Sequence, residues 1–253
     1  MTLIELKSVC KSLGGQRVLD RLDLAIDRGE TLVIMGRSGA GKSVILKHII
    51  GLMKPDSGEV LFDGQRIDTL SRHQLNETRK RFGMLFQGSA LFDSMSVQEN
   101  VCAALRRHKK LSPGEVRRIV AAKLEAVGLS GIEEKMPDEL SGGMRKRVGL
   151  ARAIAMDPEV VLYDEPTTGL DPITAHQIND LILQTRSQFG VTSVVVTHDV
   201  TNALKVGTRV CLLVNGKINF SGRPDEVRNT DNPYVRQFLE ARGVGPVTAA
   251  PSA

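Results

Sequence analysis

The chain has 253 residues, 41% of them hydrophobic, so it is long enough to bury one substantial core with a small subdomain. Its apolar runs are too short to cross a bilayer and Met1–Lys7 lack a signal-peptide pattern, so we expect a soluble, cytoplasmic protein. Three isolated cysteines argue against a disulfide framework or a zinc site, and an aromatic content of 4% argues against a base-stacking nucleic-acid platform despite the net charge of +5.

The N-terminal part predicts β-structure followed by a phosphate-binding loop. Residues 3–30 form a hairpin-like region that turns at Gly14-Gly15. Residues 31–35 predict a buried strand, and residues 44–50 predict a helix with an apolar face. Between them, residues 36–43 fit the pattern GxxxxGK[ST], which a chain of this length would show by chance about one time in a hundred. Strand, loop and helix are the context that this motif requires.

The middle of the chain predicts a helical insertion in an α/β protein. Residues 71–81 have the pattern of a charged helix, and a strand over 83–86 ends at Gln87. Residues 96–140 are helical in pattern, with few β-branched runs. Within them, residues 112–115 combine a Ser cap with Pro at the first helical position and Glu at the third, so a helix should begin there.

The C-terminal part alternates strands with helices. In chain order we expect a helix over 142–156, a strand over 159–163, a helix over 172–189, a strand over 191–197, a helix over 199–206, a strand over 209–214, a strand pair around Gly216, a helix near 233–242 and a flexible tail over 243–253. Such alternation implies a mostly parallel, buried sheet.

Basic residues gather in three short clusters, at 79–81, 106–110 and 145–147. We interpret these clusters as solvated helix faces, because lysine and arginine are rarely buried. Contact with an acidic partner surface or with anionic lipid headgroups is the functional alternative.

The phosphate-binding loop carries residues suited to a nucleoside triphosphate. Backbone N–H groups at a helix N-terminus can solvate the phosphates, and glycines let the backbone approach them. Lys42 would bridge the β- and γ-phosphates, and Ser43 would place its hydroxyl on Mg²⁺. A plain glycine turn before a helix is the alternative, but it leaves Lys42 and Ser43 unexplained. The predicted ATP-binding residues here are Gly36, Arg37, Ser38, Gly39, Ala40, Gly41, Lys42, Ser43 and Val44.

Three further polar residues follow predicted strands. Asp164 and Glu165 come after four apolar residues, where charges are costly unless they meet a cation or water. We expect Asp164 to hold Mg²⁺, directly or through water, and Glu165 to act as general base on the attacking water. His198 follows a strand end, where ligands collect in α/β sheets, and would contact the γ-phosphate. A strand meeting a surface turn and a structural histidine are the alternatives.

These motifs resemble the ATP-binding cassette (ABC) family over nearly the whole chain. The matching segments, in order, are residues 36–43, Phe86-Gln87, Leu140-Ser141-Gly142-Gly143-Met144, Asp164-Glu165-Pro166, Gly169-Leu170-Asp171 and His198. The second glycine-rich loop, residues 140–144, is the family's signature loop.

The resemblance implies a catalytic assembly of two copies. Two cassettes would pair head to tail, so that each phosphate loop faces the partner's signature loop. Ser141, Gly142 and Gly143 would then bind the ATP held by the second copy. Asp171 would couple the two sites, and Gln87 would join Mg²⁺, take part in catalysis and sense a transmembrane permease.

Finer features resemble the ATPases of MCE-type lipid transporters, which include the systems that maintain outer-membrane lipid asymmetry (Mla). These features are residues 85–97, Met144 where the family usually has Gln, residues 171–174, and the C-terminal segments 235–239 and 245–247. The resemblance implies phospholipid transport between inner and outer membranes, driven from the cytoplasmic face of the inner membrane. Its implied partners are a permease, possible MCE- and STAS-domain subunits, and no nucleic acid. In that subgroup the C-terminal tail can reach the partner ATPase.

The implied fold is α/β, a P-loop NTPase (RecA-like) with a mostly parallel sheet, an antiparallel β region and an inserted helical subdomain. Residues 1–253 would be one ABC ATPase domain. Residues 1–87 and 157–222 would form the nucleotide-binding core, residues 88–156 the helical subdomain, and residues 223–253 a C-terminal helix and tail.

One departure from the family pattern concerns base recognition. Many cassettes stack an aromatic residue on adenine near the position of Leu13, and this chain has none there. Losing that stacking face should cost about 1 kcal/mol of base recognition. We therefore predict modest selectivity for ATP over GTP, and comparable turnover of the two nucleotides would support this. A strong preference for ATP would contradict it.

Two other functions remain open at this stage. An ATPase subunit of a small-solute importer would have the same fold, and gene neighbours would distinguish it. A soluble cassette protein acting on DNA or ribosomes usually has a second cassette or long coiled-coil insertions, and this chain shows one cassette and no heptad run. A P-loop kinase would leave the signature loop unexplained.

Overall fold

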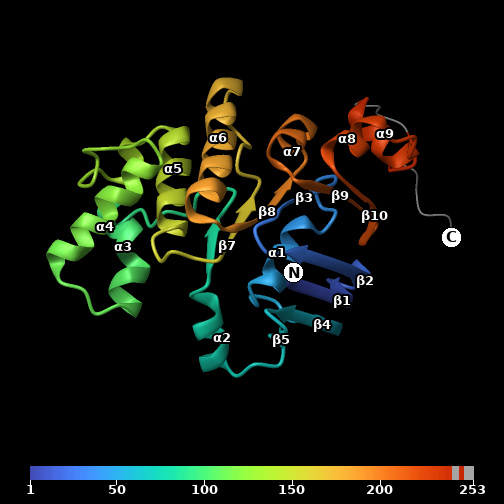
Figure 1. Cartoon of the computed structure of the whole chain (residues 1–253), viewed down its shortest axis with the longest axis horizontal. Coiled ribbons are helices and arrows are strands. Elements are labelled where there is room, and N and C mark those ends of the chain that lie inside the picture. Colours follow the sequence, from blue (N-terminus) through green and yellow to red (C-terminus); the bar gives the residue numbers. More distant parts are fainter. Residues whose placement is uncertain (241–244, 248–253) are drawn as a thin grey trace. The chain divides into compact units, whose positions relative to one another are not determined.

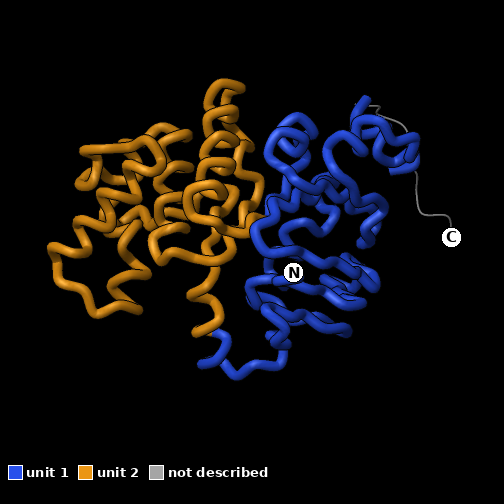
Figure 2. Tube along the Cα trace, in the orientation of Figure 1, with its two compact units in different colours: residues 1–75, 194–253 blue, residues 76–193 orange. Residues whose placement is uncertain are grey.

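The computed structural model describes residues 1–240 and 245–247. By its contacts the chain divides into two compact units, coloured separately in Figure 2. Unit 1 comprises residues 1–75 and 194–253, and unit 2 comprises residues 76–193. This division uses boundaries other than those of the core and helical subdomain expected from the sequence, which stay a prediction.

Unit 1 contains an antiparallel sheet with the strand order β2-β1-β4-β5. Its strands are β1 (Thr2–Leu13), β2 (Gln16–Asp27), β4 (Ser57–Phe62) and β5 (Gln65–Arg66). Leu22, Leu24 and Ile26 of β2 are buried and alternate with exposed residues, so one face of this strand packs inward. The β1–β2 hairpin turns at residues 14–15, as predicted (Figure 1).

Unit 1 also contains the strands that carry the phosphate-binding loop. β3 (Thr31–Met35) is completely buried and pairs in parallel with β9 (Arg209–Val214), which pairs antiparallel with β10 (Lys217–Gly222). The helices of this unit are α1 (Lys42–Ile49), α7 (Val200–Val206), α8 (Pro224–Asn229) and α9 (Pro233–Leu239). Two elements run across the unit boundaries, α2 (Arg72–Arg79) and β8 (Thr192–Thr197).

Unit 2 combines a parallel strand pair with a group of helices. β6 (Phe82–Leu85) and β7 (Val160–Asp164) pair in parallel, and every residue of both is buried. The helices are α3 (Val97–His108), α4 (Pro113–Ala126), α5 (Gly142–Ala153), α6 (Pro172–Phe189) and the short 3-10 helix η1 (Pro137–Glu139). Helices α3, α4 and α5 pack against one another (Figure 1).

The predicted start of α4 is confirmed. The Ser112 hydroxyl accepts the Glu115 N–H at 3.3 Å, and the Glu115 carboxylate accepts the Ser112 N–H at 2.7 Å, which is a complete capping box. The helical pattern expected over 96–140 is wrong for residues 109–112, which separate α3 from α4, and for residues 127–136. There the N–H groups of Gly128 and Leu129 bond back to the carbonyls of Glu125 and Leu124, which closes α4 in a Schellman arrangement.

The pairings β3–β9 and β6–β7 confirm the expected parallel strands, and β1–β2–β4 form the expected antiparallel region. Helix α8 was not anticipated from the sequence, because six residues are too few to show a period. Of the tail predicted over 243–253, the structure describes residues 245–247, and the rest lies outside the described residues. Within the described part of the chain, none of the helices has the length and apolar character needed to span a membrane.

Candidate nucleotide-binding and hydrolysis site

The phosphate-binding loop of unit 1 connects the carboxyl end of β3 to α1. Gly41 has a φ of 102°, and a Cβ there would lie 2.9 Å from Cγ1 of Val18. Both the left-handed backbone and the close approach therefore require glycine at this position. Among the described residues, no side chain caps the N-terminus of α1. The first N–H groups of this helix are thus arranged for an anion.

Lys42 directs its side chain into the curve of the same loop. Its Nζ donates to the carbonyl of Gly36 at 2.8 Å and to that of Arg37 at 3.1 Å, and the residue is only 6% exposed. The ammonium group is therefore held where a bound phosphate would meet it. Ser43 and Val44 follow in the first turn of α1 and are half-buried.

A pocket of about 360 Å³ lies beside the loop. Arg37, Ser38, Gly39 and Ala40 line it together with the start of β2 and the turn at 213–216. Arg37 also donates to the carbonyl of Val247 at 3.2 Å. Leu13, at the position where we expect the nucleotide base, is 41% exposed at the end of β1.

His198 lies in unit 1, directly after β8, and is exposed. The next residue, Asp199, caps α7 by accepting the Asn202 N–H at 3.0 Å, so the chain turns sharply at this strand end. The expected position of His198 at the carboxyl end of a strand is confirmed, and its contact with a γ-phosphate stays a prediction.

Unit 2 brings Gln87, Asp164 and Glu165 to the same edge of its strand pair. Leu85 pairs with Tyr163 in parallel register, so both strands end at one level. Asp164 is the last residue of β7, Glu165 follows it directly, and Gln87 lies two residues beyond β6. Asp164 and Glu165 are 9% and 8% exposed, whereas Gln87 is exposed.

Glu165 combines burial with an unusual backbone. Its φ of 47° is in the left-handed region, which is uncommon for a residue other than glycine. Its carboxylate accepts the Thr168 hydroxyl at 3.2 Å, and its carbonyl accepts the Thr168 N–H at 3.3 Å. The carboxylate is thereby oriented by the turn that follows β7.

The signature loop leads directly into α5. Ser141 caps this helix, because its hydroxyl accepts the Met144 N–H at 3.3 Å. A Cβ on Gly143 would lie 2.6 Å from Cγ2 of Thr174, so only glycine fits between the loop and α6. Thr174 in turn donates its hydroxyl to Asp171 at 2.5 Å.

Asp171 caps α6 and lies beside the signature loop. Its Oδ1 accepts the N–H groups of Ile173 and Thr174, each at 3.0 Å. The hydrogen bond from the Thr174 side chain is the main reason that the pKa of Asp171 is lowered. Unit 2 therefore places two predicted site segments, 141–143 and Asp171, against each other.

Sequence reasoning missed two buried polar residues near this edge. Lys146 is 4% exposed and donates to the carbonyls of Gln87 and, at 3.3 Å, Glu165. The interpretation of residues 145–147 as a solvated helix face is therefore wrong for Lys146. Asn100 is fully buried, and its amide donates to the carbonyls of Phe92, Met95 and Ser96, which fixes the chain beyond Gln87.

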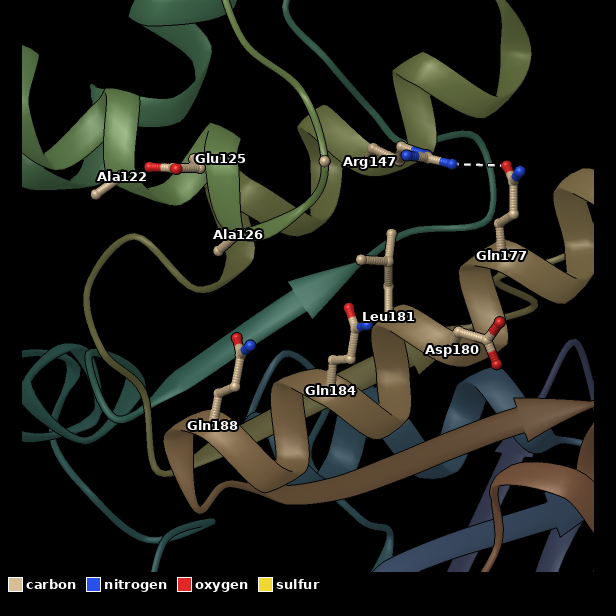
Figure 3. Close-up of a pocket in the computed structure, with 10 residues that line it drawn as sticks. Ala122, Glu125, Ala126, Arg147, Gln177, Asp180, Leu181, Gln184 and Gln188 are labelled. Atoms are coloured by element: carbon tan, nitrogen blue, oxygen red, sulfur yellow. Dashed lines mark hydrogen bonds between the residues drawn. The ribbon is translucent and has the colours of Figure 1, made fainter.

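A larger pocket, of about 620 Å³, lies elsewhere in unit 2, among α4, α5 and α6 (Figure 3). Its lining is mostly polar, and Arg147 donates to Gln177 across it at 2.6 Å. The lining residues are Ala122, Glu125, Ala126, Gly128, Arg147, Gln177, Asp180, Leu181, Gln184 and Gln188. None of these is a predicted site residue, so size alone does not identify the functional site.

The predicted site residues thus fall into two groups. Unit 1 contains Gly36, Arg37, Ser38, Gly39, Ala40, Gly41, Lys42, Ser43, Val44 and His198. Unit 2 contains Gln87, Ser141, Gly142, Gly143, Asp164, Glu165 and Asp171. Within each unit they gather at strand ends and helix N-termini, which are the places where α/β proteins bind phosphates.

Known proteins are similar to this chain in both sequence and fold. A family model described as "ABC transporter" matches residues 19–168. The probable ribonucleotide transport ATP-binding protein mkl of Mycobacterium leprae is 44% identical over 96% of this chain and 70% of its own length. The intermembrane phospholipid transport ATP-binding protein MlaF of Escherichia coli K12 is 43% identical over 97% of this chain and 91% of its own length.

A solved structure of an ATP-binding cassette has a fold similar to that of this chain. An ATP-binding cassette solved as a dimer in a post-hydrolysis state, with ADP and Pi bound, is 33% identical. It superposes with a TM-score of 0.81 over 88% of this chain and 99% of its own. The expected P-loop NTPase fold is thereby confirmed. The chain belongs to the ABC transporter family and is an ATP-binding, ATP-hydrolysing cassette.

Proposed function

We propose that this chain is the ATPase subunit of a phospholipid transporter. Two copies of the chain would drive transport by closing on two ATP molecules. We infer that the transported substrate is a phospholipid from the similarity to the phospholipid transport protein, which spans 97% of this chain and 91% of that protein. The ribonucleotide transport relative is as similar in sequence, but the match covers 70% of its length.

The reaction proposed is attack of water on the γ-phosphate, which breaks the bond between the γ-phosphorus and the oxygen that bridges to the β-phosphate and releases ADP and phosphate. The N–H groups of the phosphate loop and the ammonium of Lys42 would neutralise the phosphate charge. Glu165 would take the proton of the attacking water, and His198 would contact the γ-phosphate. Ser141, Gly142 and Gly143 of the second copy would complete the site, and Asp171 would couple the two sites. The dimeric cassette with ADP and Pi supports this assembly.

The donor set predicted for Mg²⁺ suits that ion. Ser43, Gln87 and Asp164 offer a hydroxyl, an amide carbonyl and a carboxylate, and Mg²⁺ prefers oxygen ligands of this kind. Asp164 is 9% exposed, so a cation would offset the cost of its buried charge. When bound, the ion would polarise the phosphates of ATP.

A groove of unit 2 suits a permease segment. It has a volume of about 520 Å³ and is lined by Phe82, Phe92, Met95 and Met156 together with basic side chains of α2 and α3. Phe92 is 52% exposed, so the groove presents an aromatic side chain to solvent. An apolar permease segment flanked by acidic residues would cover this groove. It would hold the cassette at the cytoplasmic face of the inner membrane, alongside MCE- and STAS-domain subunits.

A small-solute importer is the second candidate, and the similarity to the ribonucleotide transport protein favours it. Affinity purification of the tagged full chain from membranes of the source organism separates the two candidates. Recovery of a permease with an MCE-domain protein and copurified phospholipid is expected. Recovery of a periplasmic solute receptor without lipid would overturn the lipid proposal while leaving the ATPase assignment intact.

A further inference from the structure

One face of the signature helix α5 holds the loop that follows β6. Arg152 donates to the carbonyls of Ser89 and Ala90, each at 2.6 Å. A Cβ on Gly149, one turn earlier, would lie 2.9 Å from Cδ1 of Leu85, at the end of β6, and 3.4 Å from Cβ of Ser89 in the loop, so the helix lies close to both. Lys146, a further turn toward the signature loop, donates to the carbonyl of Gln87. The helix therefore binds this loop by two cations on one face.

Lys146 differs from Arg152 because it also reaches the other strand end. Its ammonium group donates to the carbonyl of Glu165 at 3.3 Å, so one charge joins the backbones of Gln87 and Glu165. The residue is 4% exposed, and burial lowers its pKa, while the nearby charges of Asp164 and Glu165 act in the opposite direction. A buried ammonium is costly, and well-packed apolar residues often replace such charges without loss of stability.

The backbone that these cations hold is strained. Glu165, Ser89 and Ala90 have φ values of 47°, 62° and 46°, all in the left-handed region. Such conformations persist only where the surroundings enforce them, and they cluster at functional sites. Lys146 and Arg152 bind the carbonyls of these three residues. The charge on the helix thus opposes relaxation of the turn that presents the Glu165 carboxylate.

We propose that Lys146 is a positioning residue for ATP hydrolysis, whose ammonium group fixes the backbones of Gln87 and Glu165 relative to each other. This inference rests on the roles proposed above for those two residues. It adds a link inside one subunit. The loop of Gln87, which is expected to sense the permease, and Glu165, the proposed general base, share Lys146 as a hydrogen-bond donor. Displacement of Gln87 would thereby be transmitted to Glu165.

The test compares two buried lysines in the full chain within its transporter complex. Lys146→Met keeps the apolar stem and removes the donor. Lys123→Met is the matched control, because Lys123 is 8% exposed in the same unit and donates to Asp157 at 2.5 Å, with its ammonium 4.5 Å from the centre of the Phe189 ring. We expect Lys146→Met to lower kcat by about 10- to 100-fold with KM for ATP within about threefold, and Lys123→Met to leave both unchanged.

Lys146→Gln, which keeps a donor on a side chain one bond shorter, is measured in parallel and should give an intermediate kcat. It also keeps the test decisive if Lys146→Met fails to fold. Wild-type kcat in either folded Lys146 variant, or an equal loss of kcat in Lys123→Met, would overturn the proposal.

A double-mutant cycle with Glu165→Gln separates positioning from a general structural role. If Lys146 acts through Glu165, Lys146→Met should not further lower the residual single-turnover rate of Glu165→Gln. A further loss by the same factor as in wild type would contradict the inference. If Glu165→Gln alone hydrolyses ATP at the wild-type rate, the proposed general base is wrong, which is a different failure from an inert Lys146.

Discussion

Glu165 shows how a single residue carries both strain and chemistry. It is 8% exposed, has a left-handed backbone and is oriented by Thr168. Glu165→Gln keeps the shape and the hydrogen bond but removes the carboxylate that we propose as general base. We expect ATP binding to persist and the rate of hydrolysis to fall by about a hundredfold or more. The dimer should then accumulate in its ATP-bound state. ATPase assays and size-exclusion chromatography with and without ATP measure both effects, and a wild-type rate would exclude Glu165 as the base.

A second residue-scale prediction concerns His48, on the helix that follows the phosphate loop. It is 1% exposed, and its Nδ1 donates to the Val44 carbonyl at 2.7 Å. Burial lowers its pKa from 6.5, and the charge of Lys11 acts in the same direction. The hydrogen bond to Val44 opposes this shift most, followed by a backbone hydrogen bond to Lys54 and the charge of Asp56. Because the unfolded chain takes up the proton first, His48 should reduce the free energy of unfolding as pH falls below about 6.5, until the native pKa is reached.

The comparison uses His48→Asn, which keeps a donor near Nδ1 and cannot titrate. Urea unfolding between pH 7.5 and 5.5 should show a flatter pH dependence for this variant. The difference would reach at most about 1.4 kcal/mol per pH unit. The exposed histidines are present in both wild type and the variant, so their contributions to the pH dependence of the free energy of unfolding cancel in the difference. Identical pH dependence in the two proteins would show that His48 titrates normally.

At the scale of elements, the signature loop meets α6 at a very close contact. A Cβ on Gly143 would lie 2.6 Å from Cγ2 of Thr174, whose rotamer is held by its bond to Asp171. Gly143→Ala should therefore cost about 1–3 kcal/mol of stability. Adding Thr174→Ser removes Cγ2 but keeps the hydroxyl, so it should restore most of the loss. Thermal unfolding measures this, and an unchanged Tm in Gly143→Ala would rule out the crowding.

The elements also explain what the sequence could and could not predict. The phosphate loop, Asp164-Glu165 and His198 were predictable because each lies at the carboxyl end of a strand, and their order along the chain carries that information. The start of α4 was predictable from local capping chemistry. Its end at Ala126 was missed, although Gly128-Leu129 is a recognisable stop signal.

Lys146 and Asn100 could not be predicted from any local pattern. In sequence, Lys146 is one of three consecutive basic residues, of which Arg145 is exposed and Arg147 half-buried. Only the packing of α5 against the ends of β6 and β7 brings Lys146 to the carbonyls of Gln87 and Glu165. Asn100 likewise bonds to the backbone of Phe92, which lies in the segment before α3. The helical pattern around Asn100 does not predict where that segment lies.

At the scale of the whole molecule, the phosphate loop and the signature loop belong to different units of one chain. We propose above that each site is formed by the phosphate loop of one copy and the signature loop of the other, and a similar cassette was solved as a dimer with ADP and Pi. In that arrangement each copy contributes half of two sites. A variant defective in one loop therefore still offers its other loop to a partner.

Mixing two inactive variants tests this arrangement. Lys42→Ala removes the phosphate-loop ammonium, and Ser141→Asp keeps a helix cap while placing a negative charge where the partner's γ-phosphate is expected. Each homodimer would have two defective sites. A heterodimer combines both defects in one site and leaves the other intact, so an equal mixture should recover about a quarter of the wild-type ATPase rate when subunits exchange at random. The chain carrying both substitutions, mixed with Lys42→Ala, is the control and should stay inactive. No recovery in the first mixture after confirmed subunit exchange would mean that each chain hydrolyses ATP with its own two loops.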